Sequence, residues 1–150
     1  MTQRIGAFVM TATPHPAATD QKRATSHAPR VLIVEDELLV AWQLESMARE
    51  QHLDVCGLVP DGDGAIEQAA DLDVDLILMD IRLAGRMDGI EAARRIREQR
   101  DTPIIFITAH GDPETRAQVD RALPGAPVLA KPITAQHLRD AIAAASKSLV

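Results

Sequence analysis

Five short runs of apolar residues recur along the chain after residue 30, and branched side chains dominate them. They occupy residues 31–34, 55–59, 76–79, 104–107 and 128–130. Each run is continuous rather than alternating, which is typical of strands that are buried on both faces. The pattern therefore predicts five strands of a parallel sheet.

The segments between and after these runs have the length and spacing of helices. Apolar residues repeat at helical intervals in four of them: Val40, Leu44, Met47 and Ala48; Ile66, Ala69 and Ala70; Ile90, Ala93 and Ile96; and Leu138, Ile142 and Ala145. Residues 112–123 form a weaker helix, and Asp63, Asp88 and Thr134 are predicted N-caps. This order predicts an α/β fold, a doubly wound (βα)5 flavodoxin-like parallel sheet with strand order 2-1-3-4-5.

The first part of the chain lacks this pattern. Residues 11–30 are rich in Thr, Ala, Pro and His and show no periodicity. Such a segment buries too little apolar surface to offset the entropy lost on ordering. We therefore expect a flexible N-terminal tail over residues 1–29 and one folded domain over residues 30–150.

Composition narrows the possible functions. Sixteen basic against twenty-two acidic residues give a net charge of −6, which argues against a nucleic-acid-binding surface. The single cysteine, Cys56, excludes an intramolecular disulfide and fits a reducing cytosol. No apolar run approaches the roughly 20 residues that cross a bilayer. We expect a cytoplasmic protein that binds neither nucleic acid nor membrane.

Polar residues follow the predicted strands where each strand ends. They are Glu35 and Asp36, then Asp80, Thr108 and Lys131. The carboxyl ends of strands 1, 3, 4 and 5 lie side by side in the predicted order. Clustered carboxylates repel one another, and Mg²⁺ relieves this repulsion through oxygen ligands. A lysine and a hydroxyl opposite the metal suit a phosphoryl group, so the chemistry indicated is phosphoryl transfer to a carboxylate.

These positions carry recognisable motifs. They are VEDE at residues 34–37, LILMDIRL at 76–83, DGIEA at 88–92, FITA at 106–109 and KPI at 131–133. From about residue 30 onward the chain resembles the receiver domain of two-component response regulators, of the stand-alone type. The resemblance implies that Asp80 accepts a phosphoryl group from a histidine kinase. It implies that Glu35, Asp36, Asp80 and the backbone carbonyl of Arg82 bind Mg²⁺.

The same resemblance implies further roles at the strand ends. Thr108 and Lys131 would contact the phosphoryl group, and the Lys131–Pro132 peptide is expected to be cis. The family usually carries an aromatic switch residue three positions before the lysine, whereas this chain has Val128. Its activation route is therefore an open question.

The implied partners are a sensor histidine kinase or a phosphotransfer protein. Output would occur through protein–protein contact or through service as a phosphate sink or relay. A homodimer is also among the family's assemblies, although residues 124–127 (PGAP) would reshape the usual dimer face. We expect no enzymatic activity beyond support of the protein's own phosphorylation and dephosphorylation.

Two other functions stay open. A receiver-like scaffold would act without phosphorylation. Val128, which replaces the aromatic switch residue, is consistent with this alternative. An aspartate-nucleophile phosphohydrolase would need an acid two residues after the nucleophile, where this chain has Arg82. Arginine cannot act as a general acid there, which argues against the hydrolase.

Two surface features complete the sequence predictions. Leu38 and Trp42 fall off the core stripe of the first helix and are candidates to bind the kinase. Alternatively, Trp42 packs on the last helix or is covered by the N-terminal tail. The arginines at positions 94, 95 and 100 are expected to lie on a solvated helix face with Glu91 and Glu98 as partners.

Overall fold

Strands and helices alternate along the computed structural model, which describes residues 28–71 and 73–147. In chain order the elements are β1 (Arg30–Val34), α3 (Leu38–Glu50), β2 (Asp54–Val59), α4 (Gly62–Asp71), β3 (Leu76–Asp80), α5 (Gly89–Gln99), β4 (Ile104–Thr108), α6 (Pro113–Ala122), β5 (Val128–Ala130) and α7 (Ala135–Lys147). Every predicted strand and helix is present, including the weaker helix over residues 112–123. The predicted N-terminal tail falls almost wholly on residues 1–27, outside the described part of the chain.

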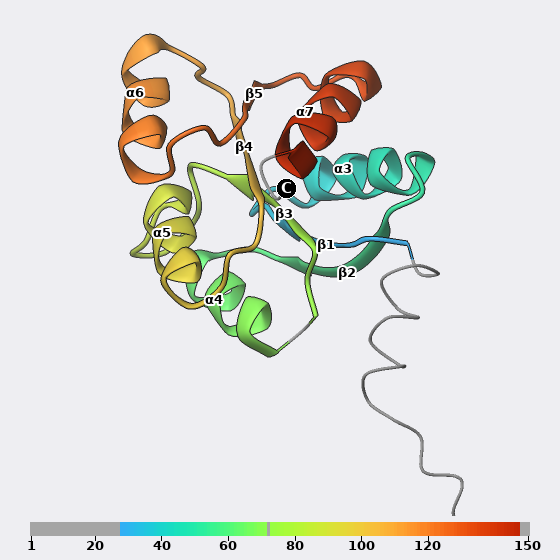
Figure 1. Cartoon of the computed structure of the whole chain (residues 1–150), viewed down its shortest axis with the longest axis horizontal. Coiled ribbons are helices and arrows are strands. Elements are labelled where there is room, and N and C mark those ends of the chain that lie inside the picture. Colours follow the sequence, from blue (N-terminus) through green and yellow to red (C-terminus); the bar gives the residue numbers. More distant parts are fainter. Residues whose placement is uncertain (1–27, 72, 148–150) are drawn as a thin grey trace, which may run out of the picture.

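The five strands form one parallel sheet in the order β2-β1-β3-β4-β5, which confirms the predicted topology. Helices α4, α5 and α6 cover one face of the sheet, and α3 and α7 cover the other (Figure 1). Three helical crossovers therefore lie on one side, and the strands end together at one edge.

Alternate residues of each central strand enter different halves of the core. In β1, Leu32 and Val34 belong to the cluster under α4, α5 and α6, whereas Val31 and Ile33 belong to the cluster under α3 and α7. Strands β3 and β4 divide their side chains in the same way. Both faces are thus covered, which explains why these runs are apolar at every position.

The buried faces of two helices differ in detail from the predicted stripes. In α3, Ala41 and Ala48 are buried with Leu44, while Val40 and Met47 are only half-buried. In α4, Ala69 is buried, Ile66 is half-buried and Ala70 is exposed. Alanine is small and weakly apolar, so its spacing alone did not show which face of a helix turns inward.

Helix starts follow local hydrogen bonds. Asp88 caps α5 by accepting the N–H of Glu91 at 2.8 Å, and Thr134 accepts the N–H of His137 at 3.1 Å, as predicted. The prediction for Asp63 is wrong, because Asp61 accepts the N–H of Gly64 at 2.7 Å instead. The helix thus begins two residues earlier than a cap at Asp63 would give, at Gly62.

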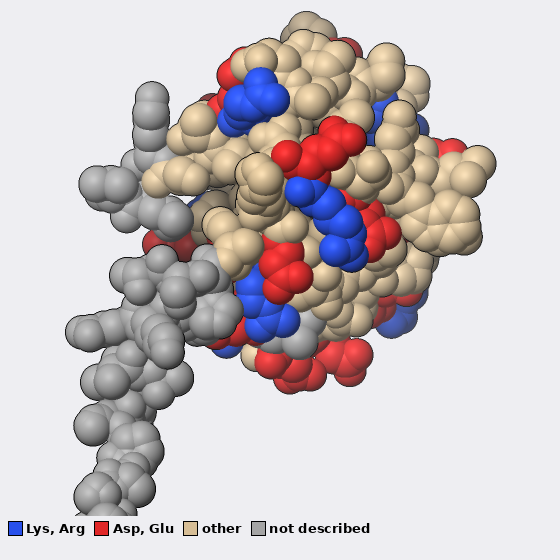
Figure 2. Space-filling model, turned by 90° about the vertical axis from the view of Figure 1, so that its right-hand side faces the viewer, with Lys and Arg blue, Asp and Glu red and all other residues tan. Residues whose placement is uncertain are grey.

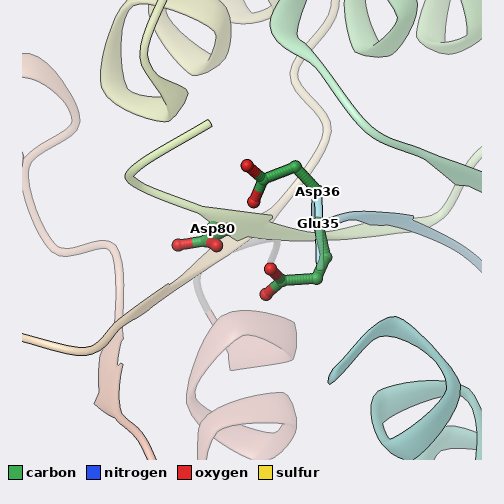
Figure 3. Close-up of side chains that lie close together, drawn as sticks. All are labelled: Glu35, Asp36 and Asp80. Carbon is green, nitrogen blue, oxygen red and sulfur yellow. The ribbon is translucent and has the colours of Figure 1, made fainter. Parts of the chain in front are cut away.

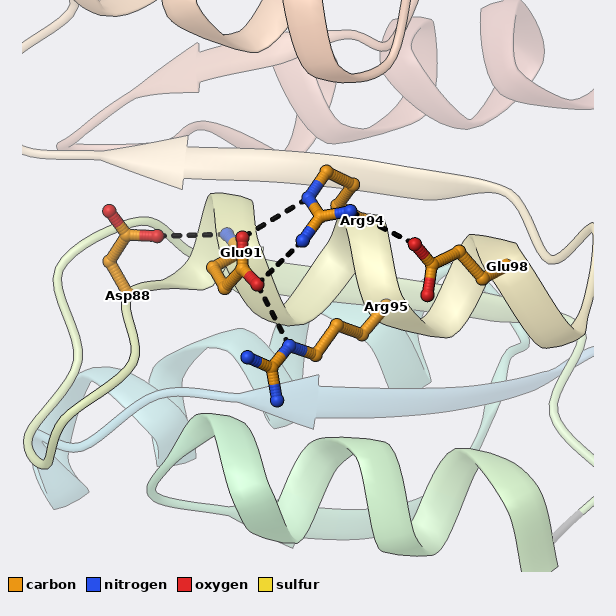
Figure 4. A network of polar contacts seen from close by, with 5 residues as sticks. All are labelled: Asp88, Glu91, Arg94, Arg95 and Glu98. Carbon is orange, nitrogen blue, oxygen red and sulfur yellow. Dashed lines mark hydrogen bonds and ion pairs between the residues drawn. The ribbon is translucent and has the colours of Figure 1, made fainter.

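The exposed side of α5 is the solvated charged face that the sequence predicted for Arg94 and Arg95, whereas Arg100 lies just past the end of the helix (Figure 4). Glu91 pairs with Arg94 at 2.7 Å and with Arg95 at 2.8 Å, and Arg94 also pairs with Glu98 at 2.9 Å. Hydrogen bonds from Arg94 and Arg95 lower the pKa of Glu91 to about 2. These arginines are therefore matched by carboxylates rather than free for phosphates.

Charge is mixed on other surfaces as well. On the face of the molecule in Figure 2, Lys and Arg lie beside Asp and Glu and form no broad basic patch. Within residues 28–71 and 73–147, no helix combines the length and apolarity that a bilayer crossing requires.

Candidate functional site at the carboxyl edge of the sheet

The sheet brings the predicted site residues together at its carboxyl edge. Glu35 and Asp36 follow β1, Asp80 ends β3, Thr108 ends β4, and Lys131 follows β5. Since these four strands are neighbours in the sheet, residues up to 96 positions apart in sequence meet at one place.

Three carboxylates converge there from adjacent strand ends (Figure 3). One oxygen from each of Glu35, Asp36 and Asp80 lies within 4.8 Å of the others. Glu35 and Asp80 are buried, whereas Asp36 is exposed. The cluster therefore has two buried carboxylates and one, that of Asp36, in contact with solvent.

Lys131 adds a positive charge to this cluster. Lys131 Nζ lies 3.2 Å from Asp80 Oδ2 and 3.0 Å from Glu35 Oε1. Burial alone lowers the pKa of Lys131, but the hydrogen bond with Glu35 and the attraction of Asp80 and Glu35 outweigh it and raise the pKa. The ammonium group thus remains charged between two carboxylates. The sequence placed Lys131 at this edge but did not predict its ion pair with Glu35.

Glu35 has an unusual environment for a carboxylate. Its side chain is 0% exposed, Oε2 accepts the N–H of Glu37 at 3.1 Å, and Oε1 has the lysine ion pair but no hydrogen bond of good geometry. Burial, reinforced by nearby Asp80, raises the pKa of Glu35 to about 7, although the N–H of Glu37 and Lys131 oppose the rise.

This donor set fits a hard divalent cation. The three carboxylates supply only oxygen ligands and lie close enough to share one ion. Glu35 Oε1 is buried and has no hydrogen bond of good geometry, so it is available as a metal ligand. Mg²⁺ prefers such oxygens and keeps water on its remaining positions, and the exposed Asp36 lies where water has access.

The backbone after β3 also takes part. Asp80 Oδ1 accepts the N–H of Arg82 at 3.2 Å, which turns the start of the β3–α5 loop toward the carboxylate. The Arg82 side chain is exposed. The main chain of Arg82 thus contacts Asp80 through its N–H, and the role of its carbonyl as a metal ligand stays a prediction.

Thr108 lies at the site but does not point its hydroxyl at Asp80. It is 1% exposed, and its Oγ1 accepts the N–H of His110 at 3.0 Å and lies 3.3 Å from the His110 carbonyl oxygen. A contact with a phosphoryl group would need these bonds to be exchanged. The Lys131–Pro132 peptide beside it is cis, as predicted.

At the position of the usual aromatic switch, the main chain of Val128 is contacted by Arg116. Val128 is half-buried, and Arg116 of α6 donates from Nε to the Gly111 carbonyl at 3.1 Å and from Nη1 to the Val128 carbonyl at 3.5 Å. The guanidinium group thus joins the loop after Thr108 to β5. Nothing in the sequence pattern indicated this arrangement.

An apolar surface borders the site on α3. Leu38, Leu39 and Trp42 are 58%, 76% and 52% exposed, so Trp42 is not buried against the last helix. The alternative that the N-terminal tail covers Trp42 lies outside the described residues. Leu39 was not singled out in the sequence. Next to them a groove of about 300 Å³ is lined by Val40, Gln43, Met47 and Ile133, and Lys131 and Pro132 form its end near the site.

Comparison with known proteins gives one consistent family. The family model for the response regulator receiver domain matches residues 31–143. The transcriptional regulatory protein PdtaR of Mycobacterium tuberculosis is 38% identical over 115 residues, which cover 75% of this chain and 54% of that protein. The chain thus spans about half the length of that relative.

Solved structures agree with the sequence comparison. The signal receiver domain of a modulated diguanylate cyclase from Desulfovibrio desulfuricans is 40% identical, with a TM-score of 0.73 over 81% of this chain and 98% of that one. The receiver domain of the sensor histidine kinase PA1611 from Pseudomonas aeruginosa is 35% identical, with a TM-score of 0.66 over 75% and 93%. That structure has a magnesium ion coordinated in its active-site cleft.

Proposed function

The chain belongs to the response regulator receiver domain family, and we propose that Asp80 is its phosphoacceptor. The observation that carries this proposal is the position of the Asp80 carboxylate, which lies beside two further carboxylates and the Lys131 ammonium group. The phosphodonor would be the phosphohistidine of a sensor histidine kinase or a phosphotransfer protein.

The chain supplies the nucleophile and two of the groups that contact the phosphoryl oxygens. An oxygen of the Asp80 carboxylate attacks phosphorus, the P–N bond to the donor imidazole breaks, and the electron pair stays on the imidazole nitrogen. Lys131 balances the charge of the phosphoryl oxygens. Thr108 exchanges its bonds with His110 for a bond from its hydroxyl to a phosphoryl oxygen.

Magnesium completes the proposed site. Glu35, Asp36 and Asp80 would hold it, together with the backbone carbonyl of Arg82. When bound, Mg²⁺ supplies positive charge that offsets the charge of the phosphoryl oxygens. The magnesium ion in the cleft of the 35%-identical receiver domain supports this proposal.

The exposed apolar surface supports a place for the donor. We propose that Leu38, Leu39 and Trp42, with the groove beside them, bind a helix of the kinase or phosphotransfer protein. An amphipathic helix buries its apolar face in a groove of this kind, and tryptophan is enriched among the residues that dominate binding. The groove ends at Lys131, so a bound helix would lie next to Asp80. Phosphorylation would then change contacts with other proteins or pass the phosphoryl group onward.

Mass spectrometry tests the phosphoacceptor directly. Treatment with acetyl phosphate and Mg²⁺ should add one phosphoryl group, and Asp80→Asn should remove this labelling because an amide oxygen is a poor nucleophile. Asp61→Asn is the matched control, since asparagine can still cap α4 and this position lies outside the acidic cluster. Undiminished labelling of Asp80→Asn would reject the assignment. An unlabelled parent protein would favour the scaffold alternative.

A further inference from the structure

Gly89 lies against the main chain of the site. It is the first residue of α5, it is buried, and its N–H donates to the Ile81 carbonyl at 2.7 Å. Helix α5 therefore begins directly on the peptide that follows Asp80.

This contact leaves no room for a side chain. A methyl group on Gly89 would overlap the Asp80 carbonyl oxygen and would lie 2.9 Å from the carbon of that carbonyl and 3.0 Å from Ile81 Cα. All three are backbone atoms, so a side-chain rotation cannot relieve the clash. Either α5 or the Asp80–Ile81 peptide would have to move.

The peptide is held from its other side as well. Ile81 N–H donates to the Ile107 carbonyl of β4 at 3.0 Å, and β3 pairs with both β1 and β4. Asp80 is thus fixed between β4 and the start of α5. The N–H of Arg82, one peptide further on, is the group that orients Asp80 Oδ1.

We propose that Gly89 is a positioning residue of the phosphoacceptor site. The missing side chain lets α5 set the position of the Asp80 main chain and of the Arg82 peptide, and therefore of two of the four groups assigned to Mg²⁺. This inference rests on the proposed function. Gly89 touches neither metal nor phosphoryl group and acts through the backbone of Asp80 and Ile81.

The first test compares two glycines that begin helices. Gly89→Ala should weaken Mg²⁺ binding about tenfold or more, because misplaced supporting groups typically reduce metal affinity by that factor. Gly62→Ala is the control: that glycine begins α4, and an added methyl would lie 3.2 Å from Ala92 Cβ and 3.1 Å from Met87 Sδ, away from the Asp80 peptide. Its Mg²⁺ affinity should stay within about twofold of the parent protein.

Calorimetric titration with Mg²⁺ and labelling by acetyl phosphate serve as readouts, at a temperature where circular dichroism shows each variant folded. A purely structural role would lower the melting temperature and leave the Mg²⁺ affinity of the folded protein unchanged. Folded Gly89→Ala with the parent's affinity and labelling rate would overturn the proposal.

A second pair of variants avoids the steric clash, in case Gly89→Ala does not fold. Asp88→Ala removes the cap that holds the first turn of α5, whereas Asp88→Asn retains a cap and removes the charge (Figure 4). Asp88→Ala should bind Mg²⁺ more weakly than Asp88→Asn. Equal affinity in the two would overturn the proposal. A parent protein that neither binds Mg²⁺ nor becomes labelled would contradict the proposed function itself, and the role of Gly89 would fall with it.

Discussion

Two carboxylates and one ammonium group share the buried part of the site, and Asp36 adds a third carboxylate at its exposed rim. Lys131 balances part of the negative charge of Glu35 and Asp80. Asp36 lacks such a partner among the described contacts of the site, and it faces water. A bound metal ion would therefore be the main group that balances the charge of Asp36.

Replacement of Asp36 with alanine should weaken Mg²⁺ binding strongly, by more than about tenfold, since one ligand of a small set is lost. The metal-free fold should be unaffected or slightly stabilised, because Asp36 is exposed and its removal relieves repulsion in the cluster. Calorimetric titration measures the affinity, and thermal unfolding in EDTA measures the stability. Unchanged affinity in Asp36→Ala would mean that the metal site lies elsewhere.

Glu35 predicts an unusual pH dependence of stability. Its pKa is about 7 in the folded protein, against 4.5 for a solvated glutamate. Between these values the folded state holds a proton that the unfolded state has lost, so the free energy of unfolding of the metal-free protein should fall as pH rises from about 4.5 to about 7. Mg²⁺ needs the ionised carboxylate, so its affinity should weaken as pH falls through about 7.

Urea unfolding in EDTA at several pH values between about 5 and 8 measures this slope. Glu35→Gln should flatten it, because the amide does not titrate. Glu67→Gln, on the exposed side of α4, is the control and should keep the parent's slope. The same slope in Glu35→Gln as in the parent would show that another group is responsible.

At the residue scale, the sequence predicted which side chains gather but not how they pair. Glu35, Asp80 and Lys131 each follow a recognisable strand, so topology alone brings them to one edge. Pairing depends on side-chain torsions, which no spacing encodes. For that reason the Lys131–Glu35 ion pair and the turn of the Thr108 hydroxyl toward His110 could be found only in three dimensions.

At the element scale, α3 is followed at its C-terminal end by a residue in the left-handed backbone conformation. His52, just past the C-cap Gln51, has a φ of 63°. The N–H groups of His52 and Leu53 donate to the carbonyls of Arg49 and Ala48 at 2.9 and 3.0 Å, which closes the helix. Glycine usually takes this position, since other residues are strained there by about 1–2 kcal/mol.

His52→Gly should therefore increase the free energy of unfolding by about 0.5–1 kcal/mol, the strain relieved less the extra entropy of the unfolded chain. His52→Ala removes the same imidazole without relieving the backbone and should not stabilise the protein. Urea unfolding measures both variants. Equal stability of the glycine and alanine variants would remove backbone strain as the explanation.

The elements themselves were the most predictable level. Continuous apolar runs and caps such as Asp88 and Thr134 are local signals, and the structure has them where the sequence placed them. The misplaced cap at Asp63 and the exposed Ala70 have a common cause. Two aspartates flank Gly62, and α4 has buried and exposed alanines, so residue type alone did not show which aspartate caps the helix or which alanine is buried.

At the scale of the whole molecule, the exposed apolar surface on α3 is the proposed site of contact with another protein. For kinase binding, Trp42→Ala should slow phosphotransfer from the cognate kinase but not from acetyl phosphate. The melting temperature should hardly change, because substitutions at exposed positions usually alter stability by less than about 0.5 kcal/mol.

Phosphotransfer kinetics with both donors, and thermal unfolding by circular dichroism, make this comparison. Gln43→Ala, one residue away on the groove wall, indicates how far the binding surface extends. A destabilised Trp42→Ala variant with normal transfer from the kinase would reject the binding role.

The exposure of Trp42 also determines what the intrinsic fluorescence of this protein can measure. It is the only tryptophan among 150 residues, and half of it lies in water. Its emission is therefore already that of a hydrated indole, and unfolding of the domain should shift the spectrum little. A helix that covers α3 would remove that water and move the emission to shorter wavelengths. The intrinsic tryptophan fluorescence of the chain should therefore change little on unfolding and clearly on binding of a partner helix to α3.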